Sequence, residues 1–297
     1  MHTLMSVNKW FFLIIILMLN VFFHQSAVAS SSVWKISKEG SYFYLGGTIH
    51  VLTATDHPLP SEFSTAYKDS NIIYFETDLD AMQLPKYQSK IMAEMSNRDG
   101  QTLADQLDTK TYTNLTTYLT ARHLSPAQFD SLQPWAASLM LTMMEYQRLG
   151  MLPDYGVDTY FNKRAQDDGM KRMSLETPDA QLAALSSMSK IDPNDYVQYT
   201  LEDLERLPEF ITEMKTAWRK GDIASLSKID MIKTMKTDFP EIYNTLLTNR
   251  NNNWMKELVR LNDDKNTEFV LVGALHLYGE DGLLVLLAQA GFKITQL

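Results

Sequence analysis

The same short pattern stands near both ends of the chain, each time directly after an apolar stretch of strand-like composition. Residues 42–45 lead into Gly47-x-x-His50, and residues 268–272 lead into Gly273-x-x-His276. A loop, a helix and a further strand are expected after each copy. Two such strand–helix–strand units predict an internal duplication. They also predict an α/β fold with a mixed or parallel sheet, because strands alternate with helices.

The two ends have to meet in one sheet if both units belong to it. The pattern between them is mainly helical, so residues 85–262 are expected to form a long helical insertion. A short strand is expected at 171–175 within that stretch. The predicted architecture is therefore a mixed sheet built from two similar units that carry Gly-x-x-His, with the insertion between them.

The amino-acid composition limits which catalytic and metal-binding groups the chain can use. Cysteine is absent from the 297 residues, which removes disulfides, thiolate metal sites and cysteine nucleophiles. Any metal ion would have to bind His, Asp and Glu side chains. The net charge is −9 and no block of five basic residues occurs, which disfavours nucleic-acid binding.

The N-terminal segment has the composition of an export signal. One lysine, Lys9, precedes the stretch 10–23, which is apolar except for Asn20, and Ala27-Val28-Ala29 follows. This pattern predicts a secretory signal peptide over residues 1–29 and a periplasmic or secreted domain over 30–297. An uncleaved signal anchor is the alternative. No later stretch approaches the ~20 apolar residues of a membrane span, so none is expected after cleavage.

Several polar side chains follow directly after predicted strands. His50, His276 and Glu76 do so, and Glu176 follows the short strand near 171–175. In open α/β sheets, ligands bind beyond the carboxyl ends of the strands, so these side chains are expected to converge. Two imidazoles and one or two carboxylates can hold a divalent metal ion. The same groups could act as acid–base pairs without a metal.

Two further residues are candidates for the functional site, although each could also have a purely structural role. Asp158 stands at the start of a predicted helix, where an acidic residue is favoured for structural reasons alone. Arg250 lies inside a predicted helix, where arginine is usually on the surface, but it could instead hold a substrate anion or an oxyanion. The motifs of the common zinc proteases, serine hydrolases, phosphate loops and dinucleotide sites are absent.

Taken in order, these short motifs resemble the TraB/PrgY/GumN family over about residues 33–297. The residues that carry the resemblance are Gly47-Thr48-Ile49-His50, Tyr74-Phe75-Glu76, Gly156-Val157-Asp158, Leu175-Glu176-Thr177, Arg250-Asn251 and Val272-Gly273-Ala274-Leu275-His276-Leu277. The family includes the animal Tiki proteins, which are metal-dependent proteases, and it looks distantly similar to erythromycin esterases and ChaN haem-binding proteins.

The resemblance implies a duplicated α/β core with its site between the halves. By position, His50, His276 and Glu76 would form the core of that site, and Asp158, Glu176 and Arg250 match further motif positions. We therefore expect an exported, metal-dependent hydrolase, a peptidase, in which His50 and His276 bind a manganese, cobalt or zinc ion and Glu76 is either a third ligand or the general base. Arg250 would hold a substrate carboxylate or the developing oxyanion. Its substrate would be a peptide or another small molecule.

Two alternatives stay open. A metal-free hydrolase of the esterase kind would use His50 or Glu76 to activate water directly. A non-enzymatic protein would use the same site to bind haem or a peptide, with the histidines as iron ligands.

Overall fold

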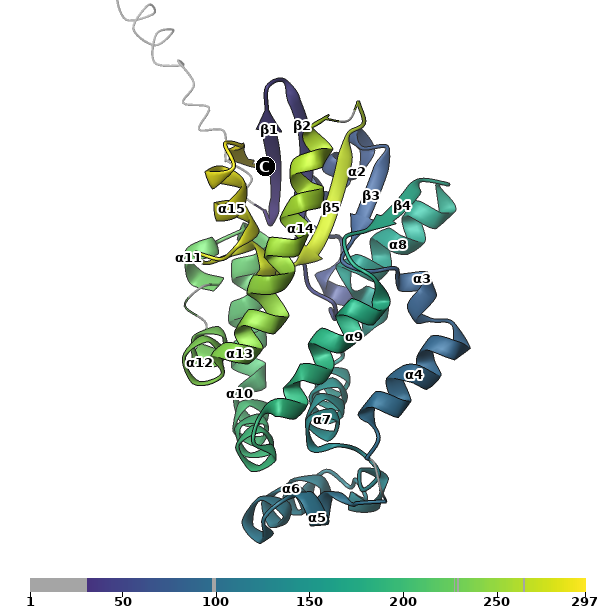
Figure 1. Cartoon of the computed structure of the whole chain (residues 1–297), viewed down its shortest axis with the longest axis vertical. Coiled ribbons are helices and arrows are strands. Elements are labelled where there is room, and N and C mark those ends of the chain that lie inside the picture. The colour runs from purple at the N-terminus through teal and green to yellow at the C-terminus, as the bar shows by residue number, and fades with distance from the viewer. Residues whose placement is uncertain (1–30, 98–99, 227, 229, 264) are drawn as a thin grey trace, which may run out of the picture.

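The computed structural model describes residues 31–97, 100–226, 228, 230–263 and 265–297. The predicted signal peptide, residues 1–29, lies outside these residues. The centre of the described part is a six-stranded sheet with the strand order β4-β3-β5-β2-β1-β6 (Figure 1). The strands are β1 (Val33–Lys38), β2 (Ser41–Thr48), β3 (Ile72–Phe75), β4 (Lys171–Ser174), β5 (Glu268–Gly273) and β6 (Lys293–Gln296).

Four neighbouring strands run in the same direction. β5 pairs in parallel with β2 on one side and with β3 on the other, and β3 pairs in parallel with β4. β1 is antiparallel to both β2 and β6. The mixed sheet and the α/β class that the sequence predicts are thus confirmed, while the internal duplication stays a prediction. In the register of β2 and β5, Gly47 lies opposite Val272 and Thr48 opposite Gly273, so the two Gly-x-x-His motifs start side by side.

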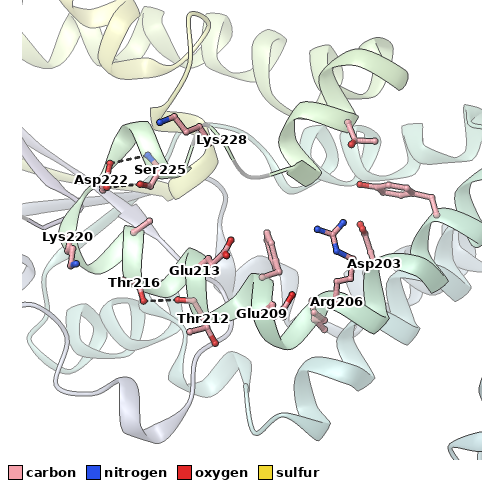
Figure 2. Close-up of a pocket in the computed structure, with 15 residues that line it drawn as sticks. Asp203, Arg206, Glu209, Thr212, Glu213, Thr216, Lys220, Asp222, Ser225 and Lys228 are labelled. Atoms are coloured by element: carbon pink, nitrogen blue, oxygen red, sulfur yellow. Dashed lines mark hydrogen bonds between the residues drawn. The ribbon is translucent and has the colours of Figure 1, made fainter.

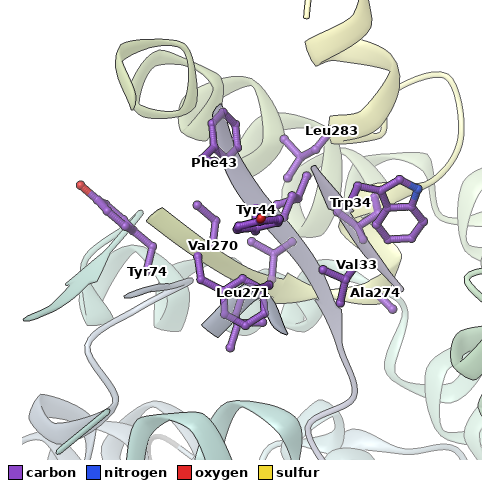
Figure 3. Packing of buried hydrophobic residues seen from close by; sticks show 14 of the residues in the cluster. Val33, Trp34, Phe43, Tyr44, Tyr74, Val270, Leu271, Ala274 and Leu283 are labelled. Atoms are coloured by element: carbon purple, nitrogen blue, oxygen red, sulfur yellow. The ribbon is translucent and has the colours of Figure 1, made fainter. Parts of the chain in front are cut away.

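The core strand is β5, whose six residues are all buried. Phe269 on β5 packs against Phe63 of α2 (Ser61–Asp69) and Phe161 of α8 (Val157–Asp167) on one face of the sheet. Helix α14 (Asn249–Arg260) crosses the other face, where α15 (Leu283–Gln289) also lies (Figure 1). Figure 3 shows the apolar side chains of the strands and of α15 packed together in this core. Both faces of the sheet are therefore covered, as parallel strands require.

Among the described residues of the stretch 85–262, β4 is the one strand, and it joins the edge of the sheet beside β3; the other regular elements of that stretch are helices. Its helices build a second apolar cluster, mainly from α6 (Thr109–Ala121), α7 (Pro134–Arg148) and α10 (Pro193–Lys220). Within the described ranges, no helix is both long and apolar enough to cross a membrane. The remaining α-helices are α3 (Leu79–Met82), α4 (Pro85–Met95), α5 (Leu103–Gln106), α9 (Pro178–Ser186), α11 (Ile223–Leu226), α12 (Asp230–Asp238) and α13 (Pro240–Tyr243).

One tryptophan of α10 contacts the sheet at the end of β2 and so connects the helical stretch 85–262 to the sheet. Trp218, in the last turn of α10, is fully buried, and its Nε1 donates a hydrogen bond to the Gly47 carbonyl at 2.7 Å. The Trp218 carbonyl accepts a hydrogen bond from the Ser32 hydroxyl at 2.6 Å. The position of α10 is thereby tied to the first Gly-x-x-His motif.

We expect Trp218→Phe to lower the free energy of unfolding by about 2 kcal/mol, because it deletes this hydrogen bond and leaves space where the larger ring was. Urea unfolding followed by circular dichroism measures the change. Tyr160→Phe is the control. Because Tyr160 is 38% exposed, this substitution should change the free energy of unfolding by no more than about 0.5 kcal/mol. Equal losses in the two variants would contradict this role of Trp218.

Candidate functional site

The carboxyl ends of the four parallel strands bring the predicted polar side chains together. His50 follows β2, Glu76 follows β3, Glu176 follows β4 and His276 follows β5. Arg250 approaches them from the first turn of α14. The candidate site therefore lies beyond the sheet edge at which ligands bind in open α/β folds.

Glu76 is buried and ionised. Its side chain is 6% exposed; Oε1 accepts a hydrogen bond from the Gly273 N–H at 2.6 Å, and Oε2 accepts one from Arg250 Nη2 at 2.6 Å. Gln181 of α9 reaches the same Oε2 at 3.4 Å. Burial opposes ionisation, but the positive charges of Arg250 and His50 and the hydrogen bond from the Gly273 N–H lower the pKa of Glu76 to about 2.

Arg250 joins the two glutamates. It follows a π-helical turn, Asn244–Thr248, and its Nε lies 3.1 Å from both carboxylate oxygens of Glu176. Its Nη2 donates to Glu176 Oε1 at 2.6 Å as well as to Glu76. Trp254, one turn further along α14, donates from Nε1 to Glu176 Oε2 at 3.1 Å. The guanidinium thus compensates two carboxylates that are each less than a tenth exposed.

The tautomer of His276 follows from the bonds of Asn251. The Asn251 amide nitrogen donates to the carbonyls of His276 and Asp281, at 3.3 and 2.7 Å, so its oxygen faces the imidazole. That oxygen lies 2.7 Å from His276 Nδ1, which must therefore carry the proton. The lone pair is left on Nε2, which accepts from Arg250 Nη1 at 3.0 Å. Burial lowers the pKa of His276 to about 3, so the ring is neutral at pH 7.

His50 is oriented by a carboxylate in a similar way. Its Nδ1 lies 2.8 Å from Asp158 Oδ2, and Asp158 Oδ1 accepts a hydrogen bond from Thr48 at 2.9 Å. Asp158 stands in the first turn of α8, which approaches so closely that a Cβ on Gly156 would collide with the His50 carbonyl. The negative charge of Asp158 raises the pKa of His50 to about 9. The His50 side chain is 62% exposed, so the site is open to solvent at this residue.

Gly273 marks the point on which these groups converge. A Cβ on Gly273 would lie 3.1 Å from Glu76 Oε1, 3.4 Å from His50 Nε2 and 3.7 Å from His276 Cδ2. The φ angle of Gly273 is not positive, so the backbone conformation does not require glycine at this position. What glycine provides here is space, because a Cβ would crowd the Glu76 carboxylate. A larger residue would fill the room between the carboxylate and the two imidazoles.

The donor set suits a divalent ion in its chemistry. Both histidines have Nδ1 held by a neighbouring oxygen, which leaves each Nε2 for a ligand, as is usual for metal-binding histidines. The residues that could hold an ion are His50, His276 and Glu76. In the arrangement described, however, no three His, Asp or Glu side chains of the described ranges are spaced to hold one. Two of these donors are in contact with Arg250 instead, through Nη1 to His276 Nε2 and Nη2 to Glu76 Oε2.

The structure gathers all six residues that the sequence singles out: His50, Glu76, Asp158, Glu176, Arg250 and His276. Sequence reasoning assigned no role to Asn251, Trp254 or Gln181. Asn251 follows Arg250 directly, and Trp254 stands four residues after it, the spacing that places two side chains on one helix face. Gln181 gave no signal, because its contact with Glu76 depends on how α9 packs.

A separate cavity of about 620 Å³ lies along α10, away from the strand ends (Figure 2). Its lining mixes acids such as Asp203 and Glu213 with bases such as Arg206 and Lys220. None of the six predicted site residues lines it. We place the candidate site at the strand ends because the predicted side chains converge there, around the Glu76 carboxylate and the two imidazoles.

Comparison with known proteins agrees with the predicted resemblance. The model of the TraB/PrgY/gumN family matches residues 32–296. The uncharacterized protein YbaP of Escherichia coli (strain K12) is 23% identical over 247 residues, which cover 82% of this chain and 86% of YbaP. YbaP of Shigella flexneri is 23% identical over 245 residues, covering 81% and 85%. No solved structure matches the chain.

The contacts of His276 make a spectroscopic prediction. In protein treated with a chelator, we expect His276 to remain neutral, with its proton on Nδ1, between pH 5 and 8, because burial lowers its pKa to about 3. We expect His50 to stay protonated in the same range, because Asp158 raises its pKa to about 9. Long-range ¹H–¹⁵N spectra distinguish these forms, with His50→Gln and His276→Gln used to assign the signals. A His276 signal that titrates near pH 6.5 would contradict this description.

Proposed function

The chain belongs to the TraB/PrgY/gumN family, and we propose that it is an exported, metal-dependent hydrolase that cleaves peptides. The observation that carries the proposal is the convergence at Gly273. Two imidazoles whose Nδ1 atoms are already engaged meet an ionised glutamate there. Family resemblance supports the choice of peptides, and the composition of residues 1–29 supports export.

Charge balance favours a divalent cation. Glu76, Glu176 and Asp158 are three carboxylates, and Arg250 is one guanidinium, so the site holds one net negative charge while His50 is protonated and two once His50 loses that proton to bind the ion. A divalent ion bound to neutral imidazoles would neutralise it. Burying such a cluster without compensation is costly, which favours occupancy by a cation.

Each residue has a task in the proposed reaction. His50, His276 and Glu76 would hold the ion, which when bound polarises a carbonyl group and acidifies water. Asp158 and Asn251 keep the two imidazole rings in the required tautomer and orientation. If the two histidines hold the ion without it, the ionised Glu76 carboxylate would instead accept a proton from the attacking water. Arg250 supplies N–H donors for the oxygen on which negative charge develops.

Metal content is the first test. We expect the chain from residue 30 onward, purified without a histidine tag and soaked in Mn²⁺, Co²⁺ or Zn²⁺, to retain about one ion per molecule. The His50→Ala/His276→Ala double variant should retain none, because two of the three ligands are gone. A His57→Ala/His123→Ala variant is the matched control, since neither histidine lies in the site; His57 contacts the Tyr155 carbonyl instead. Equal ion content in all three proteins would show that His50 and His276 are not the ligands.

Turnover is the second test. Against a peptide library, the metal-loaded chain should lose its activity in a chelator and regain it with one of the three ions. Glu76→Gln should lower kcat by at least ~100-fold, the ordinary contribution of a general base. Full activity in Glu76→Gln would remove Glu76 from the mechanism.

A metal-free hydrolase is a second candidate, favoured by the pair of His50 and Asp158. A histidine whose Nδ1 is bound to a buried carboxylate and whose Nε2 is open is the arrangement of a general base. No step of this reaction needs an ion.

The two candidates differ in their response to pH. Without a metal, His50 must be neutral to accept a proton, and Asp158 raises its pKa to about 9. Esterase activity should then rise as the pH increases toward 9, and a chelator should leave it unchanged. Loss of this activity in a chelator would exclude the metal-free candidate.

A further inference from the structure

We infer that Arg250 and a divalent ion compete for the same two acceptors, so that metal binding displaces the guanidinium from His276 and Glu76. This inference rests on the proposed metal-dependent function. It gives Arg250 two positions, one against His276 and Glu76, and one beside the bound ion.

The competition follows from the single lone pair that is available on the His276 imidazole. Asn251 fixes the proton on Nδ1, so Nε2 has a single lone pair. Arg250 Nη1 uses that lone pair at 3.0 Å. A metal ion bound to Nε2 needs the same lone pair, so the two contacts exclude each other.

Glu76 adds an electrostatic conflict. Arg250 Nη2 lies 2.6 Å from Glu76 Oε2, in a group where the Glu76 side chain is 6% exposed and the Arg250 side chain 13%. A doubly charged ion on the same carboxylate would repel the guanidinium at short range, and little solvent is present to screen the two charges.

Glu176 provides the place to which Arg250 can withdraw. It binds Nε through both of its oxygens and Nη2 through one of them, and none of these contacts involves His276 or Glu76. Trp254 supports the same position, because its ring lies 4.7 Å from the guanidinium carbon and its Nε1 binds Glu176. Arg250 can therefore give up His276 and Glu76 while its Glu176 contacts persist. The two N–H groups that it frees would then be available to donate to a substrate oxygen.

The alternative role for Arg250 makes the opposite prediction for metal affinity. If Arg250 only positions Glu76 as a ligand, its removal weakens metal binding. If Arg250 competes with the ion, its removal strengthens binding, because the ion no longer has to break charge-assisted hydrogen bonds.

The test is titration calorimetry with Mn²⁺, Co²⁺ and Zn²⁺, each alone, on the chain from residue 30 after treatment with a chelator. We expect Arg250→Gln to bind at least one of these ions more tightly than the wild type, on the order of tenfold. The matched control is Arg260→Gln on the same helix, because Arg260 pairs with Glu257 at the surface with 71% of its side chain exposed. Its affinity should equal that of the wild type.

The possible outcomes distinguish failure of the competition from failure of the proposed metal-dependent function. If the wild type binds an ion and Arg250→Gln binds it equally or more weakly, the competition is overturned and the proposed metal-dependent function stands. If neither protein binds any ion, the metal-dependent function itself fails. Binding by Arg250→Gln alone would support the competition in its strongest form.

Arg250→Gln leaves two buried carboxylates without their cation and could unfold when no metal is present. Thermal unfolding covers that case. We expect the ion to raise the melting temperature of Arg250→Gln by more than that of the wild type, because the ion replaces the lost charge. Arg250→Lys, which keeps a positive charge, should bind the ion nearly as the wild type does. A smaller rise in Arg250→Gln than in the wild type would overturn the inference.

Discussion

Parallel pairing of β5 with β2 and β3 is the constraint on which the rest of the site depends. Strands that run in the same direction end at the same edge, so residues from distant parts of the chain arrive there together. Glu76 and Gly273 are 197 positions apart in sequence, yet the Gly273 N–H binds the Glu76 carboxylate at 2.6 Å. The buried apolar residues of β5 hold this register, because a slip by one residue would turn every side chain to the opposite face.

The polar groups at this edge are compatible with burial only as a set. Glu76 and Glu176 are each less than a tenth exposed, and an isolated buried carboxylate would be strongly destabilising. Arg250 compensates both, while Asn251 and Asp158 hold the two imidazoles. A network of this kind sustains perturbed pKa values and ring orientations that an open surface would not. The fold thus stabilises the groups that the proposed chemistry uses.

Much of this could be read from the chain itself. The apolar runs before Gly47 and Gly273, the helix expected after each Gly-x-x-His motif and the mixed α/β class all follow from local pattern and agree with the structure. Four candidate residues, His50, Glu76, Glu176 and His276, were found because they directly follow strands that share one edge, while Asp158 and Arg250 were found by their match to the family's motifs. Gln181 gave no comparable signal, since an amide side chain in a helix is ordinary until its neighbours are known, and Asn251 was only part of a motif with no role assigned to it.

The sequence by itself determined the strands, the helices and the residue types available for chemistry, because these depend on periodicity and composition within a few neighbours. Only the tertiary structure decided which side chains meet, which nitrogen of His276 carries the proton, and that Arg250 lies against His276 and Glu76 and not on the surface. Those features depend on contacts between segments that are far apart in the chain. Their energies come from burial and from exact placement of charges, neither of which a local pattern contains.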